Sequence, residues 1–124
     1  MKQLLFQGDY RDLKDTQLVG QFNTFRLGTK YAKGKKALKI GEIVWLIHVD
    51  KDGKERKICR AVVTFTFNNK LDNLLAHFSE TNHAIKRNQL NSAKALRTIL
   101  EGIYRRKAKN GEHQFTAVGL VRLI

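Results

Sequence analysis

The stretch Glu42-Ile43-Val44-Trp45-Leu46-Ile47-His48-Val49 is a near-continuous apolar run, which is typical of a buried β-strand. It is followed by Asp50-Lys51-Asp52-Gly53-Lys54, a strong turn signal. Residues 58–67 then alternate between two faces, one of which is more apolar. Together these segments predict a long β-hairpin, with Trp45 in the core of the protein, as the centre of the fold.

Shorter patterns on both sides of this hairpin predict the remaining strands. Residues 2–6, 22–27 and 115–124 are β-prone, and 28–39 reads as a basic loop. Strict alternation in 22–27 places Phe22, Thr24 and Arg26 on one face of the strand. The polar run 68–70 is expected to end the second strand of the hairpin, and 108–112 is expected to be a loop.

Helical patterns occupy three segments between the strands. Residues 10–19 follow Asp9, a good N-cap, and end at Gly20. Residues 71–78 and 92–104 carry apolar side chains at helical spacing, whereas 79–91 has no clear pattern. The order predicts one α+β domain over residues 1–124, built on a small mixed or antiparallel sheet that curls into a barrel.

The amino-acid composition excludes several classes of protein. The chain has 124 residues, 24 Lys and Arg against 11 Asp and Glu, and a formal charge of +13. A single cysteine excludes a disulfide framework and a Cys-cluster zinc site, and no apolar run is long enough to span a membrane. We therefore expect a soluble, cytoplasmic protein that needs no metal and no cofactor.

The charge is unevenly placed along the chain. Residues 26–39 contain six basic residues and no acid, and 86–109 contain eight basic residues and one acid. Such segregation favours a face that receives a polyanion, which makes nucleic acid the expected partner. The alternative is a surface that is made soluble by lysine and has no such partner.

Several segments together resemble the ASCH domains of the PUA-like superfamily. They are Thr24-Phe25-Arg26-Leu27-Gly28, Leu38-Lys39-Ile40-Gly41-Glu42-Ile43-Val44, Arg60-Ala61-Val62-Val63-Thr64, Lys70-Leu71-Asp72-Asn73-Leu74-Leu75 and Asn82-His83. The resemblance covers roughly residues 20–124. It implies a PUA-like small mixed β-barrel flanked by helices, with a cleft that receives RNA or a modified nucleobase.

The charge distribution and the family resemblance together suggest which residues contact nucleic acid. Arg26 can grip a phosphate or a base edge, with the Thr24 hydroxyl beside it. Tyr31 can stack on an unpaired base or anchor its loop to the core. The complete expected set is Thr24, Arg26, Lys30, Tyr31, Lys33, Lys35, Lys36, Asn82, Arg105 and Arg106.

Two enzymatic alternatives remain beside RNA binding. A ribonuclease would use His83 or His77 as acid and base, because the pKa of histidine lies near neutrality. A branch of the ASCH family that deacylates a modified cytidine places a Lys a few residues before a Thr, with a Glu further along. Here Thr24 matches, but Gln21 stands at the Lys position and Asn82, or at best Glu80, at the Glu position. A neutral Gln cannot act as a base or nucleophile.

Overall fold

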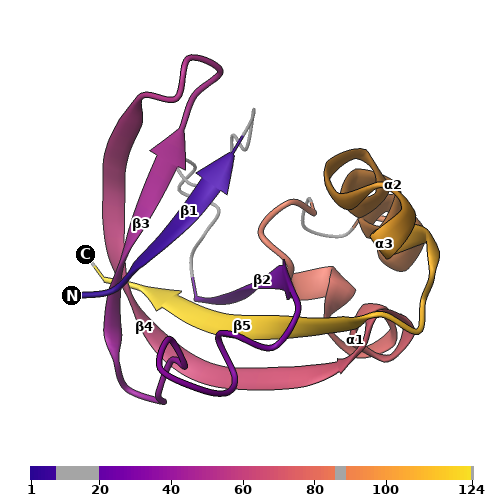
Figure 1. Cartoon of the computed structure of the whole chain (residues 1–124), viewed down its shortest axis with the longest axis horizontal. Helices are drawn as coiled ribbons and strands as arrows, with labels where there is room; N and C mark the ends of the chain where they lie inside the picture. The colour runs from indigo at the N-terminus through magenta and orange to yellow at the C-terminus, as the bar shows by residue number, and fades with distance from the viewer. Residues whose placement is uncertain (8–19, 86–88, 124) are drawn as a thin grey trace.

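The computed structural model describes residues 1–7, 20–85 and 89–123. Within them, five strands form one mixed sheet with the order β1-β3-β4-β5-β2 (Figure 1). The strands are β1 (Gln3–Gln7), β2 (Gln21–Leu27), β3 (Ile43–Val49), β4 (Glu55–Lys70) and β5 (Gln114–Arg122). β1 runs parallel to β3, and the other neighbours are antiparallel. The α+β class and the mixed sheet are therefore confirmed.

The predicted hairpin is formed by β3 and β4. In its turn, one carboxylate oxygen of Asp50 accepts hydrogen bonds from the backbone N–H groups of Asp52 and Lys54, both at 2.9 Å. Gly53 has a φ of 80°, a left-handed conformation that glycine adopts without steric cost. The local sequence therefore specifies this turn well.

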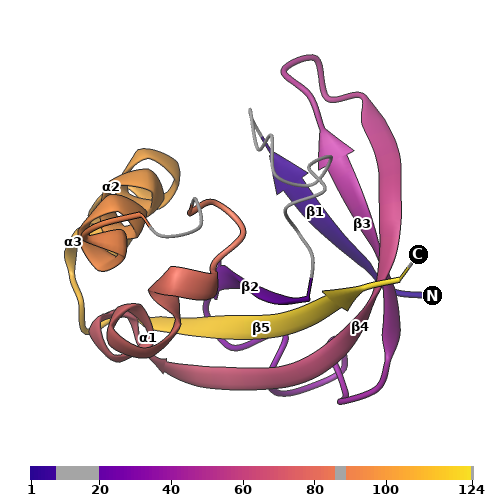
Figure 2. The ribbon, with the colours of Figure 1, turned by 180° about the vertical axis from the view of Figure 1, so that it is seen from behind.

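The long strand β4 links the two halves of the curled sheet. Its first half pairs with β3 and its second half with β5, and Ala61 and Val62 pair with both. The register shifts once in each ladder, between Leu46 and Ile47 and between Val63 and Phe65. Bulges of this kind bend a strand and increase its twist, which turns the sheet into a half-barrel (Figure 2).

The prediction that residues 68–70 end this strand is wrong. β4 continues through Lys70, because the Asn68 side chain supports the sheet instead of stopping it. Its amide donates hydrogen bonds to the carbonyl oxygens of Phe115 (3.0 Å) and Gly28 (3.2 Å). A polar side chain that bonds the neighbouring backbone thus extends the strand beyond its apolar part.

The inside of the curl is filled by side chains from all five strands, which we call the barrel core. Its buried members are Leu4, Phe6, Phe22, Leu38, Val44, Leu46, Cys59, Ala61, Val63, Val118 and Leu120. β1 and β2 are the two ends of the strand order, so the described sheet is an open half-barrel and its backbone pairing does not close the ring.

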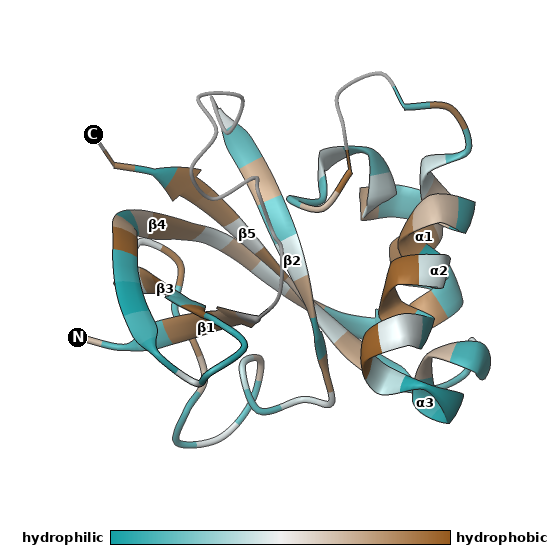
Figure 3. Cartoon of the chain, turned by 90° about the horizontal axis from the view of Figure 1, so that it is seen from above, coloured by the Kyte–Doolittle hydropathy of each residue, from teal (hydrophilic) through white to brown (hydrophobic). Residues whose placement is uncertain are grey.

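The helices pack on one end of the sheet. They are α1 (Leu71–Phe78), the 3₁₀ turn η2 (Ser79–Thr81), α2 (Ser92–Tyr104) and α3 (Arg106–Lys109). Their apolar faces bury a second cluster against Phe25, Phe115 and Ala117. Figure 3 shows these faces turned toward the sheet. The expected loop at 108–112 is partly wrong, because α3 extends to Lys109 and Ala108 is fully buried.

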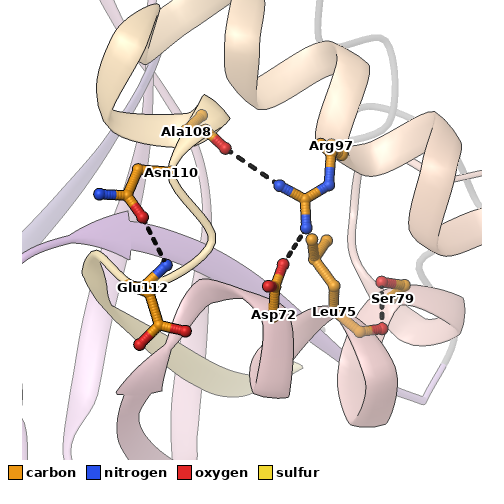
Figure 4. Close-up of polar contacts among 7 residues, drawn as sticks. All are labelled: Asp72, Leu75, Ser79, Arg97, Ala108, Asn110 and Glu112. Carbon is orange, nitrogen blue, oxygen red and sulfur yellow. Dashed lines mark hydrogen bonds and ion pairs between the residues drawn. The ribbon is translucent and has the colours of Figure 1, made fainter.

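A polar network ties the helices together (Figure 4). The Arg97 guanidinium of α2 donates to the Asp72 carboxylate of α1 and, at 3.3 Å, to the Ala108 carbonyl of α3. One side chain therefore fixes three helices relative to one another.

The predicted helix at 10–19 lies outside the described residues, as do Lys86 and Arg87.

Candidate nucleic-acid interface

The alternation predicted for β2 is confirmed by its packing. Phe22 belongs to the barrel core, whereas Phe25 and Leu27 pack in the helix cluster. Thr24 and Arg26 share the parity of Phe22 and point to the barrel side. The Thr24 side chain is only 2% exposed, so its hydroxyl lies inside the protein.

Arg26 connects the two edge strands of the half-barrel. Its Nε donates to Thr24 Oγ1 at 3.2 Å, and a terminal nitrogen donates to the Leu5 carbonyl oxygen of β1 at 2.6 Å. The guanidinium carbon lies 4.5 Å from the centroid of the Phe6 ring. We call these contacts the seam. Arg26, expected to grip a ligand, is thus placed where it holds β1 against β2.

His83 lies beside the seam and is buried. Its ring meets Phe6 edge-on at 4.9 Å between centroids, and its backbone N–H donates to the Asn23 carbonyl at 3.0 Å. Burial, followed by the nearby charge of Arg26, lowers the pKa of His83 to about 3. The ring is therefore neutral at neutral pH and lacks the acidic proton of an imidazolium, which a general acid would donate.

His77 occupies a different environment. It is exposed in the last turn of α1, with its ring 6.3 Å from that of Phe78. Among the described residues, no group of three His, Cys, Asp or Glu lies together in a way that would hold a metal ion. The two candidate catalytic histidines thus differ sharply in exposure.

Asn82, expected to contact nucleic acid, is 3% exposed and bonded within the protein. Its amide donates to Asn23 Oδ1 at 3.1 Å, and its own Oδ1 accepts from the Ala84 N–H at 3.0 Å. Asn23 in turn donates to the Phe78 carbonyl (2.9 Å) and to Thr81 Oγ1 (2.8 Å). Sequence reasoning missed Asn23; an asparagine inside an apolar strand was the available signal.

The other residues of the amidohydrolase pattern are also engaged or exposed. Gln21 donates to Thr64 Oγ1 at 3.1 Å, and Glu80 is exposed in η2. With Thr24 buried, this site presents neither a charged lysine nor an accessible hydroxyl.

The loop after β2 presents lysines to solvent. Lys30, Lys33, Lys35 and Lys36 are exposed. Tyr31 packs against the barrel core, and its carbonyl accepts the Leu38 N–H at 2.8 Å, which is the anchoring role that the sequence left open. The Lys30 ammonium lies 5.0 Å from the centroid of the Tyr31 ring.

The two basic segments of the chain adjoin paired strand ends. The Gly28 N–H donates to the Gln114 carbonyl at 2.9 Å, where the loop leaves β2 and the connection from α3 enters β5. Figure 1 shows the loop after β2 below the sheet and helix α3 at the upper right, so the two segments diverge from these strand ends. The exposed cations of these two segments, which we together call the basic corner, are Lys30, Lys33, Lys35, Lys36, Arg105, Arg106, Lys107 and Lys109.

Carboxylates at this corner are few and engaged. Glu112 pairs with Lys70 at 2.7 Å, and Asp72 pairs with Arg97. The basic corner therefore offers cations whose charge is available to an external anion.

None of the described helices is long and apolar enough to cross a membrane.

Comparisons with known proteins identify a structure of similar fold and no protein of known function. No protein-family model matches the chain, and no curated protein matches it. A solved structure, described as the crystal structure of hypothetical protein PH0355, is similar, with a TM-score of 0.59 and 14% identity. The match covers 99% of this chain and 100% of that one. At this identity the likeness shows a shared fold alone.

Proposed function

We propose that the chain is an RNA-binding domain of the ASCH type in the PUA-like superfamily and that it acts in the cytoplasm. The curled sheet with helices at one end is compatible with the barrel of that family. The observation that carries the proposal is the basic corner, whose two cationic segments adjoin the paired ends of β2 and β5 and remain exposed.

The physical basis is electrostatic. A charge of +13 on 124 residues attracts a polyphosphate, and each neutralised phosphate releases condensed counterions. Because Arg26 is engaged at the seam, phosphate contacts fall to the lysines and arginines of the corner. Such contacts position a nucleic acid without reading its sequence.

The test measures the affinity of the protein for a labelled single-stranded RNA over a range of salt concentrations, by fluorescence anisotropy. We expect a steep loss of affinity with salt. The double variant K35Q/K36Q should bind about ten-fold more weakly at low salt, and its log–log salt slope should fall by roughly 1.4, because each single-strand phosphate contact contributes about 0.7.

The matched control is K51Q/K54Q, which removes the same charge from the exposed turn of the β3–β4 hairpin. It should bind within about two-fold of the wild type. Absence of binding, or equal losses in both variants, would refute the proposal. Shortened RNA on a gel after the same incubation would instead support a ribonuclease.

A further inference from the structure

Trp45 faces the outside of the sheet, contrary to its expected place in the core. Its neighbours Val44 and Leu46 are 0% exposed members of the barrel core, so alternation turns the indole outward. The ring is half-buried and belongs to neither apolar cluster. An aromatic side chain on an outer sheet face is available for contact with a partner.

Two cations flank this indole. Arg60 is exposed and stands directly opposite Trp45 in the β3–β4 register. The register then skips Ile58, and this bulge returns Lys57 to the same face, with its ammonium 4.8 Å from the centroid of the Trp45 ring. On the other side, Trp45 is paired with Gln3, which is neutral. The indole therefore has positive charge and no carboxylate directly opposite it.

We propose that Trp45, Lys57 and Arg60 form a stacking platform for an unpaired RNA base. A base that displaces Lys57 from the ring meets the same π surface, and the ammonium and Arg60 reach the adjoining phosphates. Paired bases are inaccessible to such stacking, so the platform selects single-stranded RNA. This inference rests on the proposed function. It adds a preference for single-stranded over double-stranded RNA, which the phosphate contacts of the basic corner do not provide.

Trp45 is the only tryptophan, so its fluorescence reports on the platform alone. Titration with a short single-stranded RNA should quench it, and a blunt RNA duplex should not. In a parallel anisotropy assay with labelled RNA, W45A should bind about ten-fold more weakly and W45F should retain most of the affinity, because stacking needs an aromatic face.

F67A is the matched control, because Phe67 is a partly exposed aromatic residue of the neighbouring strand β4, 43% accessible and remote from Trp45 in the sheet. It should bind like the wild type. Thermal unfolding followed by circular dichroism verifies that each variant is folded before binding is compared.

The outcomes separate the two proposals. RNA binding with unchanged tryptophan fluorescence, and with W45A as tight as the wild type, would overturn the platform and leave the basic corner intact. Equal quenching by the duplex would also overturn it, and equal quenching by single-stranded DNA would overturn the assignment to RNA. No binding to any RNA by either assay would refute the proposed function itself.

Discussion

His83 is buried against Phe6 and near the charge of Arg26, and these surroundings couple its protonation to folding. The pKa falls from an ordinary 6.5 to about 3 in the folded protein. Above pH 6.5 the ring is neutral in both the folded and the unfolded chain. Between pH 6.5 and 3 only the unfolded chain takes up the proton, so stability falls as the pH falls.

We therefore expect the protonation of His83 to lower the free energy of unfolding by about 2 kcal/mol between pH 7 and pH 5. Urea unfolding at pH 7, 6 and 5 measures it. H83Q removes the titrating group and should show a shallower dependence on pH than the wild type. H77Q, which removes an exposed histidine, is the control for losing one imidazole. Parallel curves for H83Q and the wild type would contradict the assignment.

Residue roles were predicted less well than residue positions. Alternation in β2 correctly placed Thr24 and Arg26 together, because strand periodicity is a local property. What Arg26 bonds to depends on Leu5, 21 residues away, which the curl of the sheet brings near. The same limit applies to Trp45, since a continuous apolar run does not reveal which of its faces is covered.

At the scale of elements, Gly119 permits the bulge that bends β4. A Cβ at this position would overlap the Phe65 ring and the Thr64 hydroxyl. G119A should therefore lower the free energy of unfolding by about 1–3 kcal/mol, the usual cost of overpacking. Urea unfolding monitored by circular dichroism provides the measurement.

G102A is the matched control, because Gly102 lies in α2 and no atom of the described residues beyond its own surroundings in the helix comes within 4 Å of the place where a methyl group would stand. There alanine should raise the free energy of unfolding by about 0.5–1 kcal/mol, through its higher helix propensity. The same chemical change is thus expected to have opposite signs at the two sites. Destabilisation of similar size in both variants would contradict the role of Gly119 in the bulge.

Elements with a clear period were predicted almost to their ends, as the helix Ser92–Tyr104 shows. Those fixed by distant polar contacts were not. The parallel bridge between Asn23 and Asn82, the residue just after the turn η2, is supported by a pair of side-chain amides 59 residues apart. The extension of β4 depends on Asn68 bonding to two other strands or their ends. Side-chain amides that replace backbone partners leave no periodic trace in the sequence.

At the scale of the whole molecule, one sheet contributes side chains to two apolar clusters, and the chain carries a large net positive charge. The chain has 24 Lys and Arg against 11 Asp and Glu, so 13 cations exceed the number of carboxylate side chains that could pair with them. Most cations are thus not neutralised within the protein. Their mutual repulsion opposes the compact state, and the same repulsion is relieved when a polyanion binds.

This excess predicts opposite effects of salt on folding and on binding. Raising the salt concentration from about 50 to about 500 mM screens repulsion between exposed cations and should raise the unfolding temperature by roughly 4 °C, about 1 kcal/mol for a domain of this size. Over the same range the affinity for RNA should fall, because counterion release becomes less favourable. Thermal unfolding and anisotropy on one preparation measure both. A parallel fall of unfolding temperature and affinity would mean that salt acts by destabilising the fold, and the loss of binding would then say nothing about phosphate contacts.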